Sequence, residues 1–194
     1  MEVLADAEAA ARAAAALIAA EARAAVAARG RFSVAVSGGH TPWEMLRALA
    51  GEDVPWGGVH VLQVDERVAP AGHPDRNLTH LREIAGSPPM LDLVHLGLGP
   101  DGHTASLVPG DPVLDVTDAD VAPTGVYQGR RRLTLTYPVL DGARRVLWVV
   151  TGAEKVGMLA RLRAGDGSIP AGRVRRDQAM VLADRAAAGP PGPG

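Results

Sequence analysis

Cysteine is absent from this sequence, aromatic residues make up only 3% of it, and the formal net charge is −2. Without cysteine the chain can form no disulfide, use no thiol as a nucleophile and bind no zinc through thiolates. A net charge so close to zero gives no general attraction to nucleic acid or to an anionic membrane. The hydrophobic fraction is nevertheless 47%, so the core must be built from Ala, Val and Leu.

Long apolar runs are missing as well. The longest one near the N-terminus, at 13–20, is flanked by Arg12 and Glu21 and is too short to cross a bilayer. The sequence does not open with a basic segment followed by an apolar one, so we expect a cytoplasmic protein. Its 194 residues allow one domain with a substantial core, which we place at 1–188. A disordered tail of Gly and Pro is predicted at 189–194.

Short apolar segments alternate along the chain with segments typical of helices. Segment 6–29 is rich in Ala and is followed by Gly30, which predicts a helix that ends at the glycine. Strands are predicted at 32–36, 59–64, 93–96, 130–136, 146–151 and 179–183, with those at 59–64, 93–96 and 146–151 buried. We expect a helix at 75–84 and an irregular stretch at 111–125. The alternation predicts an α/β fold with a Rossmann-like, mostly parallel sheet flanked by helices.

The segment that follows the predicted strand 93–96 concentrates the polar chemistry of the chain. Three glycines occur within six residues, and the side chains that come with them are Asp101, His103, Thr104 and Ser106. Such glycines allow sharp turns and a close approach of a ligand, and the carboxyl ends of parallel strands are where α/β sheets bind ligands. We therefore expect a site here, although His103 as an ordinary loop histidine remains the alternative.

The three glycines, Gly97, Gly99 and Gly102, also fit the pattern of a dinucleotide-binding loop. That pattern should open a long helix, whereas Pro109 and Gly110 end the segment shortly after the third glycine. A dinucleotide site is therefore disfavoured.

A second glycine turn, Ser37-Gly38-Gly39, follows the first predicted strand. Thr41 and Glu44 have the spacing of a capping box, with Pro42 at the first helical position. Free backbone N–H groups and the helix dipole at such a turn favour a bound anion such as phosphate. An ordinary turn between a strand and a helix is the alternative.

Charged residues lie at three further places where predicted strands or helices begin or end. Asp65-Glu66-Arg67 follows the strand 59–64, and three arginines at 130–132 open another strand. Lys155 lies in the first turn of a predicted helix, where the helix dipole disfavours a cation unless an anion is near.

With these motifs in family order, the chain resembles the 6-phosphogluconolactonases of the glucosamine-6-phosphate isomerase/6-phosphogluconolactonase family. The matching segments are Ser37-Gly38-Gly39-His40-Thr41-Pro42, Asp65-Glu66-Arg67, the run 97–107, Arg132-Leu133-Thr134-Leu135-Thr136 and Gly152-Ala153-Glu154-Lys155. The resemblance implies hydrolysis of 6-phosphoglucono-1,5-lactone in the pentose phosphate pathway. It implies no metal and no organic cofactor, and it leaves open whether the protein is a monomer or a dimer.

The resemblance also implies roles for individual residues. His103 would be the general base that activates water, Asp101 would lie beside it, and Arg67 would position or polarise the ester. The 6-phosphate would be held by the 37–41 turn, Arg132 and Lys155. The substrate- or phosphate-binding positions implied are Ser37, Gly38, Gly39, Thr41, Asp65, Asn77, Gly99, Gly102, Thr104, Ser106, Arg132 and Lys155.

Two features depart from the family pattern. Arg76 precedes Asn77 where the family usually has Ser, and the segment 78–92 is shorter than its family counterpart. The related glucosamine-6-phosphate deaminases carry a catalytic glutamate at the position of Val108, and valine cannot transfer a proton. A deaminase-like isomerase and a non-catalytic sugar-phosphate-binding homologue are the alternative functions.

Overall fold

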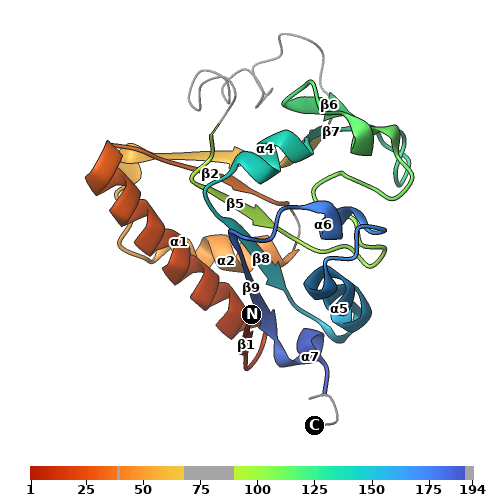
Figure 1. Cartoon of the computed structure of the whole chain (residues 1–194). Helices are drawn as coiled ribbons and strands as arrows, with labels where there is room; N and C mark the ends of the chain where they lie inside the picture. Colours follow the sequence, from red (N-terminus) through yellow and green to blue (C-terminus); the bar gives the residue numbers. More distant parts are fainter. Residues whose placement is uncertain (39, 68–89, 191–194) are drawn as a thin grey trace.

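A computed structural model describes residues 1–38, 40–67 and 90–190, with only the backbone described at 40 and 67. Its centre is a six-stranded sheet with the order β1-β9-β8-β5-β2-β3, in which every paired strand is parallel (Figure 1). The strands are β1 (Glu2–Leu4), β2 (Phe32–Val36), β3 (Val59–Gln63), β5 (Leu93–Leu96), β8 (Val146–Val150) and β9 (Ala179–Asp184). The predicted fold class and all five predicted strands of this sheet are confirmed.

A smaller antiparallel sheet adjoins the main one, with the order β4-β7-β6. It consists of β4 (Asp65–Arg67), β6 (Val121–Pro123) and β7 (Arg132–Leu135). The strand predicted at 130–136 is therefore confirmed as β7. The prediction that 111–125 is irregular was wrong in part, because β6 and the 3-10 turn Pro112–Asp115 lie within it. Pairing with β7 fixes β6 as a strand, and a segment of only three residues carries no signal of such a partner.

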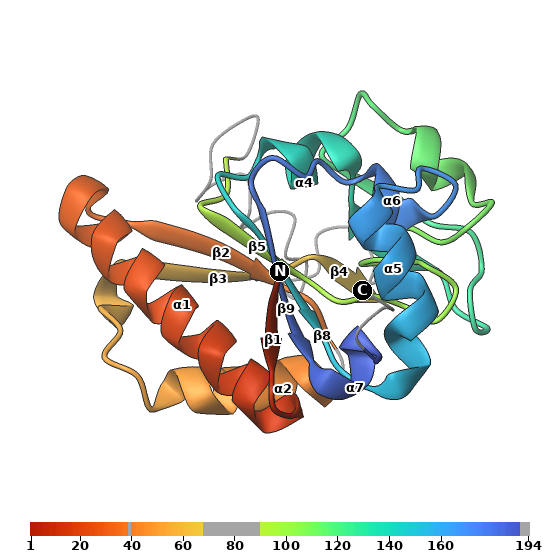
Figure 2. The same ribbon diagram turned by 60° about the horizontal axis from the view of Figure 1, so that its bottom comes forward.

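Helices cover both faces of the main sheet (Figure 2). On one face lie α1 (Ala7–Arg29) and α2 (His40–Ala50). The other face and the ends of the strands are covered by the shorter helices α4 (Tyr137–Gly142), α5 (Val156–Ala164), α6 (Pro170–Arg173) and α7 (Arg185–Ala188). Two further 3-10 turns span Trp56–Gly58 and Ala153–Lys155.

The long helix α1 follows directly from its sequence. The Asp6 side chain accepts a hydrogen bond from the Ala9 N–H at 2.7 Å, and Gly30 ends the helix with a φ of 75°. The buried side of α1 consists mainly of alanines, which lie close against β8 and β9. Small side chains allow this approach, so the alanine composition determines how closely helix and sheet pack.

Alternate residues of each central strand enter different cores. In β8, Leu147 and Val149 pack with α1 and α2, whereas Val146, Trp148 and Val150 pack with α4 and α5 on the other face. All five residues are buried, as expected for a parallel strand covered on both faces.

Two local predictions were wrong. The strand at 59–64 was expected to be buried, but Val61 is 51% exposed because β3 lies at the edge of the described sheet. The capping box expected at Thr41 does not form, because α2 begins at His40 and the Thr41 hydroxyl lies 3.1 Å from that of Thr151. The helix predicted at 75–84 and residues 191–194 of the predicted tail lie outside the described residues.

A histidine is buried within the sheet. His95 of β5 is 0% exposed, and its Nδ1 accepts a hydrogen bond from the Ser37 N–H at 3.3 Å. Its Nε2 is buried without a hydrogen-bond partner among the described residues. Burial lowers the pKa of His95 from 6.5 to about 4, so the imidazole is neutral in the folded protein at neutral pH.

This depressed pKa predicts a loss of stability in acid. The unfolded chain takes up a proton at His95 near pH 6.5, whereas the folded chain does so only near pH 4. The free energy of unfolding should therefore fall as the pH drops through this range, by roughly 3 kcal/mol from this group. In His95→Asn, which retains an acceptor for Ser37 but cannot titrate, urea unfolding should depend less on pH between 7 and 4. His60→Asn, at a less buried histidine of β3, is the control, and an equal pH dependence in wild type and His95→Asn would contradict the prediction.

Candidate active site

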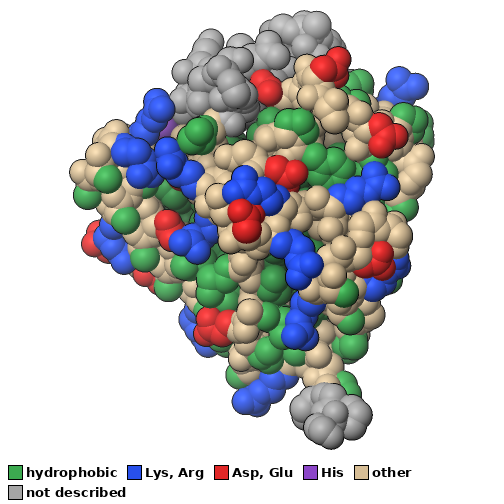
Figure 3. All heavy atoms as spheres, viewed as in Figure 1, with side chains coloured by type: hydrophobic (Ala, Val, Ile, Leu, Met, Phe, Trp, Pro, Cys, Tyr) green, Lys and Arg blue, Asp and Glu red, His purple; other side chains and the backbone are tan. Residues whose placement is uncertain are grey.

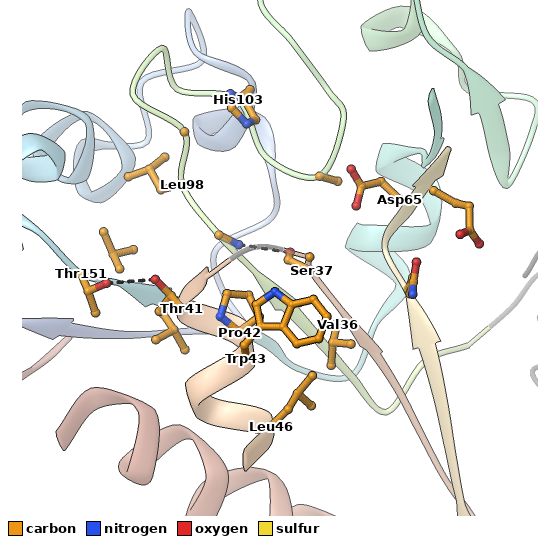
Figure 4. A pocket seen from close by; sticks show the side chains of 18 of the residues that line it. Val36, Ser37, Thr41, Pro42, Trp43, Leu46, Asp65, Leu98, His103 and Thr151 are labelled. Carbon is orange, nitrogen blue, oxygen red and sulfur yellow. Dashed lines mark hydrogen bonds between the residues drawn. The ribbon is translucent and has the colours of Figure 1, made fainter. Parts of the chain in front are cut away.

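A cleft of about 940 Å³ lies at the carboxyl ends of β2, β5 and β8 (Figure 4). Segments far apart in the sequence contribute to its walls, including both glycine turns and the smaller sheet. Among the predicted site residues, the cleft is lined by Ser37, Gly38, Thr41, Asp65, Gly99, His103, Arg132 and Lys155. Parallel strands deliver their loops to one edge of the sheet, which is why these separate motifs meet there.

His103 and Asp101 form a hydrogen-bonded pair at this edge. The Nδ1 of His103 lies 2.5 Å from Oδ1 of Asp101, and the His103 N–H donates to the same oxygen at 3.1 Å. Burial raises the pKa of Asp101, but the hydrogen bonds and charge of His103 outweigh that effect and leave the pKa below its usual value. The carboxylate is therefore ionised at neutral pH and accepts a hydrogen bond from the Nδ1–H of His103. In this tautomer of the neutral imidazole, Nε2 is free to accept a proton.

The glycine turn gives His103 the space that it needs. A Cβ added to Gly99 would lie 2.1 Å from Nδ1 of His103, so a side chain at 99 would overlap the imidazole. Gly102 has a φ of 83°, and a Cβ there would lie 2.7 Å from the side chain of Ile169. The two glycines thus place the imidazole against bare backbone and let the turn pack on the α6 region.

The turn after β2 is joined to the end of β5 by Ser37. The Ser37 hydroxyl donates to the carbonyl of His95 at 3.1 Å and accepts from the Gly97 N–H at 3.3 Å. Its own N–H is bonded to the His95 imidazole. The hydroxyl and N–H of Ser37 therefore hold two loops together, although the residue borders the cleft.

One side of the cleft has the features of an anion site. Gly38 and Thr41 line it at the start of α2, and the Thr41 hydroxyl is 3.1 Å from that of Thr151 at the end of β8 (Figure 4). Lys155 also lines the cleft, and its side chain is only 19% exposed. Its ammonium forms a loose ion pair with Glu154, with 3.9 Å between Nζ and Oε1. A mostly buried ammonium beside a helix start fits a phosphate group.

The second cation, Arg132, comes from the smaller sheet. Its Nη1 lies 3.6 Å from Oδ2 of Asp65, and the hydroxyl of Ser106 donates to the same oxygen at 2.6 Å. The Nε of Arg132 is buried without a hydrogen-bond partner among the described residues. Such a group costs free energy unless a ligand satisfies it, so this guanidinium has capacity for an anion. Arg130 and Arg131 are exposed, so Arg132 is the arginine of the three that faces the cleft.

Four predicted site residues in the described part of the chain do not line the cleft, and Asp101, described above beside His103, is one of them. Thr104 is 1% exposed and donates its hydroxyl to the Gly97 carbonyl at 2.9 Å, while Ser106 is 3% exposed and bonded to Asp65. Gly102 is packed against Ile169. Their observed contacts hold the loop in shape. Of Arg67 only the backbone is described, paired in register with Arg132, and Gly39 and Asn77 lie outside the described residues.

The chain matches a known protein family. The family model described as glucosamine-6-phosphate isomerases/6-phosphogluconolactonase matches residues 5–86 and 79–183. The chain belongs to this family. A 6-phosphogluconolactonase of Nostoc sp. is 32% identical over 84% of this chain and 85% of that relative.

Solved structures show the same fold. A 6-phosphogluconolactonase from Shewanella baltica superposes with a TM-score of 0.78 at 24% identity, over 95% of this chain and 97% of that one. A monomeric glucosamine-6-phosphate deaminase superposes with a TM-score of 0.76 at 17% identity, over 97% and 99% of the two chains. The fold therefore accommodates both activities of the family and does not by itself distinguish them.

A relative in the family has residues within the aligned region that this chain lacks. The two matched stretches overlap at 79–86, which lies within the segment 78–92 that was expected to be short. The alignment with the Nostoc protein spans 204 positions although this chain has 194 residues and 84% of them take part. The relative therefore has residues with no counterpart here.

Sequence reasoning missed several residues at the site. Thr151 follows β8 directly, and its position at the carboxyl end of a parallel strand was a signal that could have identified it. Trp43 lines the cleft with its side chain 61% exposed. Tyr127 contacts both Asp101 and His103, from which it is separated by 24 or more positions in the sequence, and no sequence pattern predicts that contact.

The side chains of the described part of the chain include no group of three His, Asp or Glu residues arranged to hold a metal ion. None of its helices has both the length and the apolar character needed to cross a membrane. On the face shown in Figure 3, basic and acidic side chains are intermixed, so no region of one charge dominates that face.

The contact between Gly99 and the imidazole predicts the effect of one methyl group. Gly99→Ala should displace His103 and break its hydrogen bond to Asp101, because the added Cβ would overlap the ring. Two-dimensional ¹H–¹⁵N spectra of the histidine rings should then show a loss of the single Nδ1-protonated form of His103. Gly157→Ala in α5, where a Cβ meets nothing within 4 Å, is the control. An unchanged His103 signal in Gly99→Ala would show that the turn tolerates the side chain.

Proposed function

We propose that this protein hydrolyses 6-phosphoglucono-1,5-lactone to 6-phosphogluconate, a step of the pentose phosphate pathway. The observation that carries the proposal is the Asp101–His103 pair, which lies at the edge of a cleft that also presents Lys155 and Arg132. A base and two cations in one cleft suit a substrate that has an ester to be attacked and a phosphate to be held. The name of the Nostoc relative supports the same activity.

His103 is proposed as the general base. Its Nε2 takes a proton from water as the water oxygen attacks the lactone carbonyl carbon. The bond between that carbon and the ring oxygen then breaks, and Nε2 of His103 gives the proton to the ring oxygen, which becomes a hydroxyl group. Asp101 accepts a hydrogen bond from the Nδ1–H of His103 throughout. This bond holds the imidazole in the tautomer that can act as a base, and the carboxylate stabilises the imidazolium.

Other groups are proposed to bind and orient the substrate. The phosphate would lie among Gly38, Thr41 and Lys155, with Arg132 as a second cation. Asp65 would keep the Arg132 guanidinium at the cleft. We retain Arg67 as the residue that polarises the ester and Asn77 and Gly39 as substrate contacts, on the basis of the family resemblance.

The nearest alternative within the family is deamination of glucosamine 6-phosphate. Val108 lies at the position where the family's deaminases carry a catalytic glutamate, and its side chain is apolar and 9% exposed. The two activities leave different products and are separated directly by assay.

The purified protein should accelerate the opening of freshly generated 6-phosphogluconolactone above its spontaneous rate. A coupled assay with 6-phosphogluconate dehydrogenase measures the product, and the rate in buffer alone is subtracted. Glucosamine 6-phosphate should yield no ammonia. Ammonia release without accelerated lactone opening would assign the chain to the deaminases, and binding without either reaction would indicate a non-catalytic homologue.

The same assay tests the base. General-base catalysis contributes roughly 10²–10⁴-fold, so His103→Asn should lose about that much kcat while KM changes only a few-fold. The binding groups for the phosphate remain in this variant. A His103→Asn protein with wild-type kcat would remove His103 from the chemistry.

The cations should act mainly on binding. Charge-assisted hydrogen bonds contribute about 1.5–3 kcal/mol each, so Arg132→Ala or Lys155→Ala should raise KM roughly ten- to a hundred-fold. Arg130→Ala is the matched control, because Arg130 is exposed near Arg132 in the chain but does not line the cleft. If either cation variant keeps the wild-type KM, that residue does not bind the phosphate.

A further inference from the structure

The turn between β6 and β7 carries a tyrosine to the proposed base. Tyr127 and Arg130 exchange backbone hydrogen bonds, with N···O distances of 3.0 and 3.2 Å. The two residues between them, Gln128 and Gly129, have φ angles of 50° and 76°. Positive φ at both central positions is typical of a tight hairpin turn that continues the twist of its strands. The backbone of Tyr127 is thereby fixed relative to the smaller sheet.

Tyr127 contacts both members of the Asp101–His103 pair. Its hydroxyl donates to Oδ2 of Asp101 at 3.2 Å, and its ring meets the imidazole of His103 edge to face, with centroids 5.4 Å apart and an interplanar angle of 63°. The other carboxylate oxygen, Oδ1, already accepts from the N–H and Nδ1 of His103. Three donors therefore hold the Asp101 carboxylate and prevent its rotation away from the imidazole.

Tyr127 is not among the residues that line the cleft. It therefore contacts the pair from outside the space in which the substrate would lie. Burial and the charge of Asp101, with the hydrogen bond to that carboxylate, raise the pKa of Tyr127, whereas the positive charge of Arg132 lowers it to a smaller extent. The phenol consequently stays protonated at neutral pH and remains a donor to Asp101.

We propose that Tyr127 is a positioning residue that holds the Asp101 carboxylate and the His103 imidazole in the orientation needed for general-base catalysis. The proposal rests on the proposed function for its kinetic consequence, but its structural part concerns the free protein. The phenol O–H fixes which carboxylate oxygen faces the imidazole, and it withdraws part of the negative charge from Asp101. The ring edge limits rotation of the imidazole. Asp101 and Tyr127 are the ionisable groups in contact with the base, and the charge of Arg132 acts on Tyr127.

Tyr127→Phe tests the hydroxyl alone, because the ring contact with His103 is retained. Loss of one hydrogen bond to a carboxylate should lower kcat for the lactone roughly three- to tenfold, with KM within twofold of wild type. The acid limb of the kcat/KM profile should move to higher pH, because an Asp101 carboxylate without the phenol donor stabilises imidazolium more strongly. Tyr127→Leu, which loses both contacts, should have a lower kcat than Tyr127→Phe.

Val126→Ala is the matched control. Val126 precedes Tyr127 in the chain and is 69% exposed, so its truncation should leave kcat and the pH profile unchanged. A merely structural role for Tyr127 would lower the melting temperature without moving the acid limb. Wild-type kcat and an unmoved acid limb in Tyr127→Phe would overturn the proposal.

A second measurement separates this proposal from the proposed function. In the free protein, ¹H–¹⁵N spectra recorded against pH follow the tautomer and protonation of the His103 ring. Tyr127→Phe should shift the midpoint of His103 protonation to higher pH, whether or not the protein hydrolyses the lactone. If the wild type fails to hydrolyse the lactone but this shift occurs, the function is wrong and the positioning role stands. If the His103 titration is the same in both proteins, the positioning role is wrong.

Discussion

The contact between the imidazole of His103 and the bare backbone of Gly99 constrains the whole site. It requires a turn with no side chain at 99, and Gly102, three residues later, has a positive φ that returns the chain against Ile169. Because the imidazole lies so close to the turn, its Nδ1 meets the carboxylate of Asp101, only two residues earlier. A local feature of five residues thus produces an oriented base, and the surrounding structure must hold that turn at the cleft.

Buried hydroxyl groups attach the turn to its surroundings. Thr104 binds the carbonyl of Gly97, Ser106 binds the carboxylate of Asp65, and Ser37 joins the ends of β2 and β5. These short side chains have little conformational entropy to lose, and each satisfies a polar group that would otherwise be buried without a partner. The polar residues of the motif therefore divide into those that face the cleft and those that keep the loop in place.

The two sheets contribute different loops and side chains to the site. The parallel sheet brings the loops after β2, β5 and β8 to one edge, where Thr41, His103 and Thr151 border the same cleft. The smaller antiparallel sheet supplies Asp65 and Arg132 to the cleft and places Tyr127 on the outer side of the His103 imidazole. The base thus borders the cleft and is also in contact with the hairpin turn through Tyr127.

The sequence alone determined the strands and the long helix, because apolar runs, alanine content and a capping Asp6 act locally. It also determined the polar loop of Asp101 and His103 and the family, since both depend on contiguous motifs. Only the tertiary structure decided that β3 is half-exposed at an edge, that Thr104 and Ser106 support the loop, and that Tyr127 reaches Asp101. These outcomes depend on which segments become neighbours when the sheets assemble, and a contact between residues far apart in the chain leaves no periodicity or spacing in either segment.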